Sequence, residues 1–180
     1  MRASPATAKP DLYSAESPDA SGPAALQRLK RNVLSLSGVS AVIWFEGIND
    51  LGPHGGASLR ELEQAITSGI RALRSGAPAL RIIGATLTSA RGSPEFGARE
   101  KDRKALNALI RTSGLFDAVI DFDSATANPR SGALKPEYVV PTNGVSTEDG
   151  LHPNRAGYLA MARTIDLDAL VREIATEPSS

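Results

Sequence analysis

The sequence predicts an α/β protein, a three-layer α/β/α sandwich around a parallel sheet. Three short apolar runs, at residues 39–45, 80–87 and 118–122, alternate with longer segments whose apolar residues recur every three or four positions. An unbroken apolar run such as Ala-Val-Ile-Trp-Phe at 41–45 is typical of a strand buried on both faces, which also makes Trp44 a core residue. Strands that alternate with helices form right-handed βαβ units, and these make the sheet parallel.

Helical periodicity indicates three long helices ahead of the third strand. The first begins near Ser21 and ends at Gly38. Its expected inward stripe consists of Leu26, Leu29, Val33 and Leu36. The second begins at Ser58, where Glu61 completes a capping box. The third spans residues 99–112, and its mixed charges indicate a solvated face rather than a nucleic-acid patch. The basic residues of that face are Arg99, Lys101, Arg103 and Lys104.

The remaining segments complete the expected domain. A long loop is predicted from Asp123 to Thr147, followed by helices near residues 155–163 and 167–174. In all, one domain is expected over residues 22–176, with a loosely ordered segment at 1–21 and a tail at 177–180. Residues 1–21 contain little apolar surface to offset the entropy of ordering them.

Composition excludes several functions. Twenty basic and twenty acidic residues cancel, so no overall field favours nucleic acid or a membrane surface. The absence of cysteine excludes disulfides and thiolate chemistry. No apolar run approaches the ~18 residues of a membrane span. The N-terminus also lacks the apolar core of a signal peptide, so the default expectation is a cytoplasmic location, although a longer parent protein could be secreted.

His152 is the strongest candidate for a general base. Asp149 precedes it by three residues across Gly150, a spacing that lets a carboxylate reach one ring nitrogen and leaves the other free to accept a proton. The alternative is a surface turn in which Asp149 caps the following helix. The other histidine, His54, is expected in a solvated loop, and the spacing of the two matches no metal-site signature.

Asn49 and Asp50 form a second candidate because they directly follow a predicted strand. In parallel sheets, ligands bind beyond the carboxyl ends of the strands, where residues 46–50, 87–92 and 123 onward are expected to meet. An amide there could donate a hydrogen bond to a developing oxyanion. The alternative is that Asn and Asp are simply favoured in loops after strands.

Together, the two segments resemble the SGNH (GDSL-like) serine ester hydrolases. Gly47-Ile48-Asn49-Asp50 matches the Gly-x-Asn-Asp block of that family, and Asp149-Gly150-Leu151-His152 matches its Asp-x-x-His block. The resemblance covers residues 22–176 and implies a flavodoxin-like SGNH fold. It implies that Asn49 is an oxyanion-hole donor, that Asp149 orients His152, and that Gly47 and Asp50 support the loop. It also implies a small acyl or acetyl ester as substrate, with no cofactor and no metal.

The Gly-Asp-Ser block that carries the nucleophile in this family has no counterpart in the chain. No Gly-Asp-Ser tripeptide occurs in the 180 residues, so the nucleophile is unknown and the first strands of the fold are expected to be missing. Ser58 is better explained as a helix cap. Ser14, Ser17 and Ser21 lie in a segment with no predicted strand to hold them against a base.

Three functions remain open at this point. The first is a serine ester hydrolase that forms an acyl-enzyme. The second is a truncated or non-catalytic hydrolase domain that binds ligand or self-associates. The third is a flavodoxin-like binding or receiver module. The sequence disfavours a receiver because it lacks the acidic cluster and lysine that receivers carry at strand ends. If the strand at 41–45 lies at the edge of the sheet, its apolar sequence without Lys or Pro predicts pairing with another chain.

Overall fold

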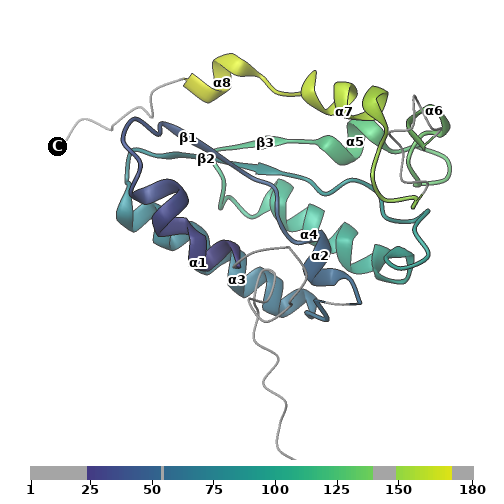
Figure 1. Cartoon of the computed structure of the whole chain (residues 1–180), viewed down its shortest axis with the longest axis horizontal. Helices are drawn as coiled ribbons and strands as arrows, with labels where there is room; N and C mark the ends of the chain where they lie inside the picture. The colour runs from purple at the N-terminus through teal and green to yellow at the C-terminus, as the bar shows by residue number, and fades with distance from the viewer. Residues whose placement is uncertain (1–23, 54, 140–148, 172–180) are drawn as a thin grey trace, which may run out of the picture.

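The structure is a computed structural model that describes residues 24–53, 55–139 and 149–171. Its described strands form one parallel sheet in the order β1-β2-β3, with β1 at Ala41–Trp44, β2 at Arg81–Ala85 and β3 at Ala118–Ile120. Val42 pairs with Ile82, and Ile83 pairs with Ala118. Helices cover both faces of this sheet (Figure 1), which confirms the predicted three-layer α/β/α fold.

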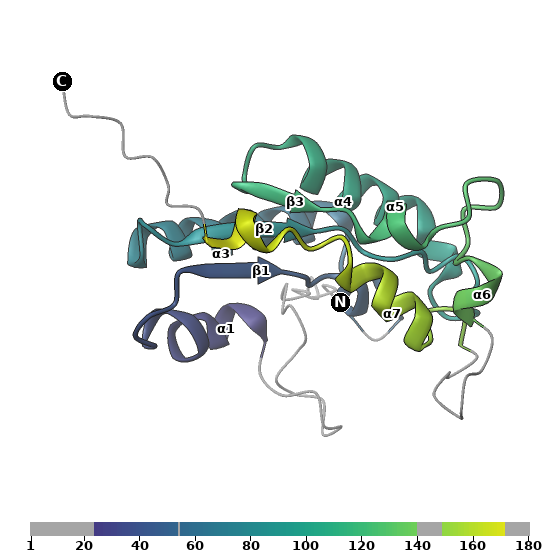
Figure 2. The same cartoon turned by 90° about the horizontal axis from the view of Figure 1, so that it is seen from above.

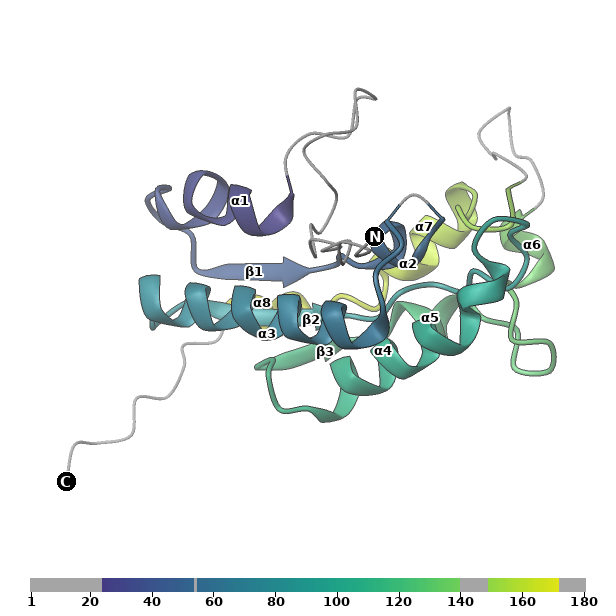
Figure 3. The same cartoon turned by 90° about the horizontal axis from the view of Figure 1, so that it is seen from below.

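Three helices cover one face of the sheet. They are α1 (Ala25–Leu29), which continues into a π-helical turn at Lys30–Leu34, α3 (Leu59–Gly76) and α4 (Glu100–Thr112). Figure 3 shows them side by side in this order. They pack a single core against the sheet, which includes Trp44, Leu62, Ile66, Ile70, Leu73, Ile82, Leu106 and Ile110.

Helix α3 follows its sequence prediction closely. The Ser58 hydroxyl accepts a hydrogen bond from the Glu61 N–H, and the Glu61 carboxylate accepts one from the Ser58 N–H at 2.8 Å. This capping box satisfies two of the amide groups that a helix start leaves without partners. Apolar residues at spacings of three and four then turn one side of the helix into the core, as amphipathic periodicity requires.

The opposite face carries shorter helices, α5 (Phe122–Thr126), α7 (Arg155–Ala162) and α8 (Leu167–Val171) (Figures 1 and 2). A smaller core on this face contains Ile83, Ala85, Ile120, Phe122 and Met161. Helix α6 (Pro136–Val139) packs against α7. None of the described helices is both long and apolar enough to cross a bilayer.

Several sequence expectations need correction. The strand at β1 is not buried on both faces, because Ile43 is 38 % exposed and the following Phe45 is 41 % exposed. Leu36 is also exposed, because the helix it was assigned to ends before it. Residues 48–51 form the short helix α2 (Ile48–Leu51) instead of a loop. The segment predicted as a loop from 123 contains α5 and α6.

Some expectations fall outside the described residues. These concern the helix start at Ser21, the boundaries of the predicted domain at 22 and 176, His54, residues 140–147 and the end of the last helix at 174.

Candidate active site

The Asp149–His152 turn holds its histidine through side-chain and backbone contacts. Oδ1 of Asp149 accepts the N–H groups of Leu151 and His152, both at 2.9 Å, and Oδ2 lies 2.6 Å from Nδ1 of His152. One carboxylate therefore shapes the turn and orients the imidazole. Nε2 of His152 points away from this contact, on a side chain that is more than half exposed.

A different residue caps the helix that follows the turn. Oδ1 of Asn154 accepts the N–H groups of Ala156 and Gly157, at 2.9 and 3.1 Å, and Asn154 is fully buried. The capping role that was the alternative explanation for Asp149 therefore belongs to Asn154, and the Asp149 carboxylate serves the turn and the His152 ring.

Gly150 allows this turn to rest on the loop after β2. Its φ of 67° lies in the left-handed region that glycine tolerates best. A β-carbon at this position would also overlap the backbone carbonyl of Gly92. Close backbone packing thus places the His152 turn against residues 92 and 93.

The Gly-x-Asn-Asp segment follows β1 directly. Gly47, with a φ of 122°, turns the chain from the strand into α2, and a β-carbon there would lie 3.1 Å from Cδ2 of Leu106. Asp50 is buried, and Asn49 is exposed on α2. Since β1 and β2 run parallel, this segment and the loop after β2 leave the sheet at the same edge.

An apolar hollow of about 110 Å³ lies beside His152. It is lined by the end of β1 and the start of α2, by residues that follow β2, and by the Asp149–His152 turn with α7. The lining residues are Phe45, Ile48, Leu87, Thr88, Leu151, His152, Pro153, Tyr158 and Met161. The structure thus brings Ile48 and His152 to one hollow, whereas Asn49 is not among the lining residues.

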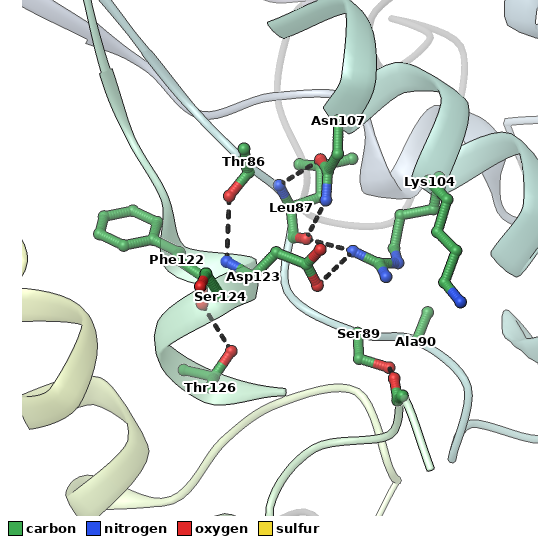
Figure 4. Close-up of polar contacts among 12 residues, drawn as sticks. Thr86, Leu87, Ser89, Ala90, Lys104, Asn107, Phe122, Asp123, Ser124 and Thr126 are labelled. Carbon is green, nitrogen blue, oxygen red and sulfur yellow. Dashed lines mark hydrogen bonds and ion pairs between the residues drawn. The ribbon is translucent and has the colours of Figure 1, made fainter. Parts of the chain in front are cut away.

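The backbone of Leu87, which lines the hollow, is fixed by a buried network of hydrogen bonds (Figure 4). Asn107 on α4 pairs with the backbone of Leu87, accepting its N–H and donating to its carbonyl, both at 2.8 Å. Arg103 also donates to the Leu87 carbonyl and, at 2.9 Å, to Oδ1 of Asp123. The backbone after β2 is therefore fixed to α4 and to the residues after β3.

Arg103 contradicts the prediction that its helix face is solvated. Its side chain is 1 % exposed, and it forms two 2.7 Å bonds to the carboxylate of Glu100. Burial by itself lowers the pKa of Arg103, but the hydrogen bonds and charges of Glu100 and Asp123 outweigh this effect and raise the pKa. The alternating charges of the helix sequence do not indicate that Arg103 is buried, because its partner Asp123 lies twenty residues further along the chain and reaches it only in the folded protein.

Asp121, like Asp123, lies just after β3, at the end of the sheet where the strands finish. Asp121 accepts hydrogen bonds from Arg111, from the Ser124 N–H and from the Thr86 hydroxyl. Partial burial opposes ionisation of Asp121, but these bonds outweigh it and lower the pKa to about 2. The Thr86 hydroxyl also accepts the N–H of Asp123 at 3.0 Å, which links the ends of β2 and β3.

Two of the described serines, Ser58 and Ser89, form structural hydrogen bonds. Ser58 caps α3, as predicted. Ser89 is fully buried, and its hydroxyl donates to the carbonyl of Gly132 at 2.6 Å (Figure 4). Ser14, Ser17 and Ser21 lie outside the described residues. Within the described ranges, no group of three or more His, Asp or Glu side chains could hold a metal ion.

The fold and the turn define a class, that of flavodoxin-like α/β proteins with an Asp–His pair at the carboxyl edge of a parallel sheet. The sequence matches the GDSL-like Lipase/Acylhydrolase family over residues 11–160. Because this match covers most of the chain, the protein belongs to that family.

Solved structures share this fold. A Bacteroides fragilis protein named as an acylhydrolase is 23 % identical, with a TM-score of 0.66 over 80 % of this chain and 67 % of its own. A GDSL-like lipase from Bacteroides thetaiotaomicron is 22 % identical, with a TM-score of 0.65 over 80 % and 68 %. A mutant acetyl esterase, solved with an acetate ion, is 17 % identical, with a TM-score of 0.53 over 78 % and 63 %. No curated protein matches the sequence.

Proposed function

We propose that this domain carries the base half of a serine ester hydrolase site acting on small acyl or acetyl esters. The observation that carries the proposal is the 2.6 Å contact between Oδ2 of Asp149 and Nδ1 of His152, beside an apolar hollow. A carboxylate at Nδ1 fixes the tautomer in which Nε2 is unprotonated and able to act as a base. Membership of an acylhydrolase family supports the same chemistry.

In the proposed reaction His152 removes the proton from a serine hydroxyl, whose oxygen attacks the ester carbonyl. Asn49 donates to the oxyanion, and Gly47 and Asp50 support the segment that presents it. The tetrahedral intermediate then releases the alcohol, which takes the proton from His152. Water, activated by the same base, hydrolyses the acyl-serine. This route needs neither a metal nor an organic cofactor.

The serine is the part of the proposal that most needs an experiment. The protein is incubated with p-nitrophenyl acetate to measure turnover, and then with a serine-reactive phosphonate whose adduct is located by peptide mass spectrometry. Turnover with one phosphonate adduct on a serine supports the hydrolase. If the protein shows no turnover and acquires no adduct, even at high protein concentration, the hydrolase proposal is contradicted for this chain.

A second candidate function is a non-catalytic domain that self-associates through residues 41–45. The described strands pair with β1 on one side only, and two apolar residues of this segment, Ile43 and Phe45, are 38 % and 41 % exposed. The opposite edge strand, β3, is flanked by Asp117 and Asp121, both paired with arginines, and charges of this kind discourage strand pairing.

Two matched substitutions test self-association. Ile43→Lys places a charge on β1, where the native side chain is 38 % exposed, and Val119→Lys places one on β3, where it is 39 % exposed. If β1 pairs with a second copy, Ile43→Lys dissociates the assembly in sedimentation experiments and Val119→Lys does not. A wild-type protein that stays monomeric across a concentration series contradicts the candidate.

A further inference from the structure

We infer that the hollow beside His152 binds a short alkyl chain attached to a carboxyl or ester group. The inference rests on the proposed function and names the substrate class of that site. The lining is predominantly apolar, since six of the nine residues have purely apolar side chains: Phe45, Ile48, Leu87, Leu151, Pro153 and Met161. Such a surface gains free energy by removing methylene groups from water.

The size of the hollow sets the length of the chain. A buried apolar cavity of roughly 150 Å³ holds a benzene molecule of six carbons. In proportion, the 110 Å³ beside His152 accommodates about four carbons. The site therefore fits butyryl-sized chains, and carbons beyond the fourth extend out of it.

The hollow is bordered by buried residues on one side and is open on the other. Leu87, Leu151 and Met161 are buried, and the Leu87 backbone is bonded to Asn107. Phe45 packs edge-on against Phe122, with the ring centroids 5.2 Å apart. Tyr158 is 49 % exposed and forms part of the open wall. A preformed floor favours binding because little ordering entropy is lost.

The polar group of the ligand is placed by His152. It is the only residue of the lining with an ionisable nitrogen, and its Nε2 is not used by Asp149. An alkyl chain in the hollow therefore leaves its carboxyl or ester group next to the proposed base, where an ester reacts.

The test measures the binding of acetate, propionate, butyrate and hexanoate by shifts in the amide NMR signals of Leu151 and His152. Each methylene buried should tighten binding by up to about fourfold. We expect this gain up to butyrate and a plateau at hexanoate. n-Butanol is tested in parallel. Shifts at His152 with butyrate and not with n-butanol indicate that the hollow binds the acyl chain of an ester, and the opposite result indicates the alcohol chain.

Two adjacent residues of α7 provide a matched pair of variants. Tyr158 lines the hollow and is 49 % exposed, whereas Leu159 does not line it and is 50 % exposed. Tyr158→Ala should weaken butyrate binding several-fold and acetate binding little. Leu159→Ala should change neither, and Tyr158→Phe, which keeps the ring, should bind like the wild type.

Equal affinities across the series, or equal effects of Tyr158→Ala and Leu159→Ala, would overturn the inference. Its failure can be told apart from failure of the proposed function, because binding is measured without turnover. Binding that depends on chain length, without a phosphonate adduct, supports the alkyl-binding hollow and contradicts the hydrolase function. A phosphonate adduct without chain-length-dependent binding supports the hydrolase function and contradicts the alkyl-binding hollow.

Discussion

The α-carbon of Gly150 lies against the carbonyl of Gly92, so the turn that carries Asp149 and His152 rests on the loop after β2. The contact joins two segments that are far apart in the sequence, and it leaves no space for a side chain. The position of the proposed base, His152, therefore depends on Gly150, which has no side chain and acts only by letting the two backbone segments come close together.

We predict that Gly150→Ala destabilises the protein more than a glycine substitution of equal backbone cost. Gly114 is the control, because its φ of 70° is similar and a β-carbon there would meet nothing within 4 Å. Gly114→Ala should lower the free energy of unfolding by about 1 kcal/mol, the cost of a left-handed alanine. Gly150→Ala should cost about 3 kcal/mol because the backbone must also move apart. Urea unfolding measures both, and equal costs would contradict the packing argument.

If the protein hydrolyses p-nitrophenyl acetate, His152→Ala should reduce kcat by at least about 10³-fold, because base and nucleophile act as a unit. Asp149→Asn should reduce it by a similar factor through loss of the tautomer. His54→Ala, which removes the other histidine, is the control and should retain full activity. Turnover that survives both changes at the Asp149–His152 turn would come from another site.

Arg103→Met should lower the free energy of unfolding by about 3–5 kcal/mol, because it leaves the carboxylates of Glu100 and Asp123 without their buried cation. Lys104→Met is the control. Lys104 also faces Glu100, at 3.9 Å, but its side chain is largely exposed, so its removal should cost at most about 1 kcal/mol. Urea unfolding of both variants measures the difference, and equal losses would contradict the role of burial.

A triple variant separates charge from packing in this cluster. Arg103→Met combined with Glu100→Gln and Asp123→Asn also removes the two carboxylate charges that lose Arg103, and it should recover part of the loss. A triple variant less stable than Arg103→Met alone would show that hydrogen-bond geometry, and not charge, dominates the cluster.

Asp121 should make stability fall in acid. Its pKa is lowered from 3.8 to about 2 in the folded protein, so the folded state binds fewer protons than the unfolded state between these values. The stabilisation is present above about pH 4 and is lost as the pH falls towards 2. The difference in unfolding free energy between wild type and Asp121→Asn should shrink over that interval. A difference that stays constant between about pH 4 and pH 2 would contradict this role of Asp121.

Features that depend on neighbours along the chain could be predicted from the sequence. The capping box of α3 joins residues three positions apart, and the stripe of that helix repeats within a few turns. The contact of Asp149 with His152 is equally local, because a glycine between them lets the chain turn back within three residues. The parallel direction of the strands also follows from the alternation of strands and helices along the chain.

The tertiary structure decided what surrounds each element, and the two decisive cases are Arg103 and β1. Arg103 has the sequence context of a solvated residue, yet it is buried because Asp123, from the segment after β3, supplies a second carboxylate. The apolar residues of β1 have the sequence context of a buried strand, yet Ile43 is exposed because the described helices cover only part of its face. The burial of a side chain and the ion pairs it forms depend on contacts with segments that are distant in the sequence. The periodicity of one segment does not indicate which distant segments will pack against it.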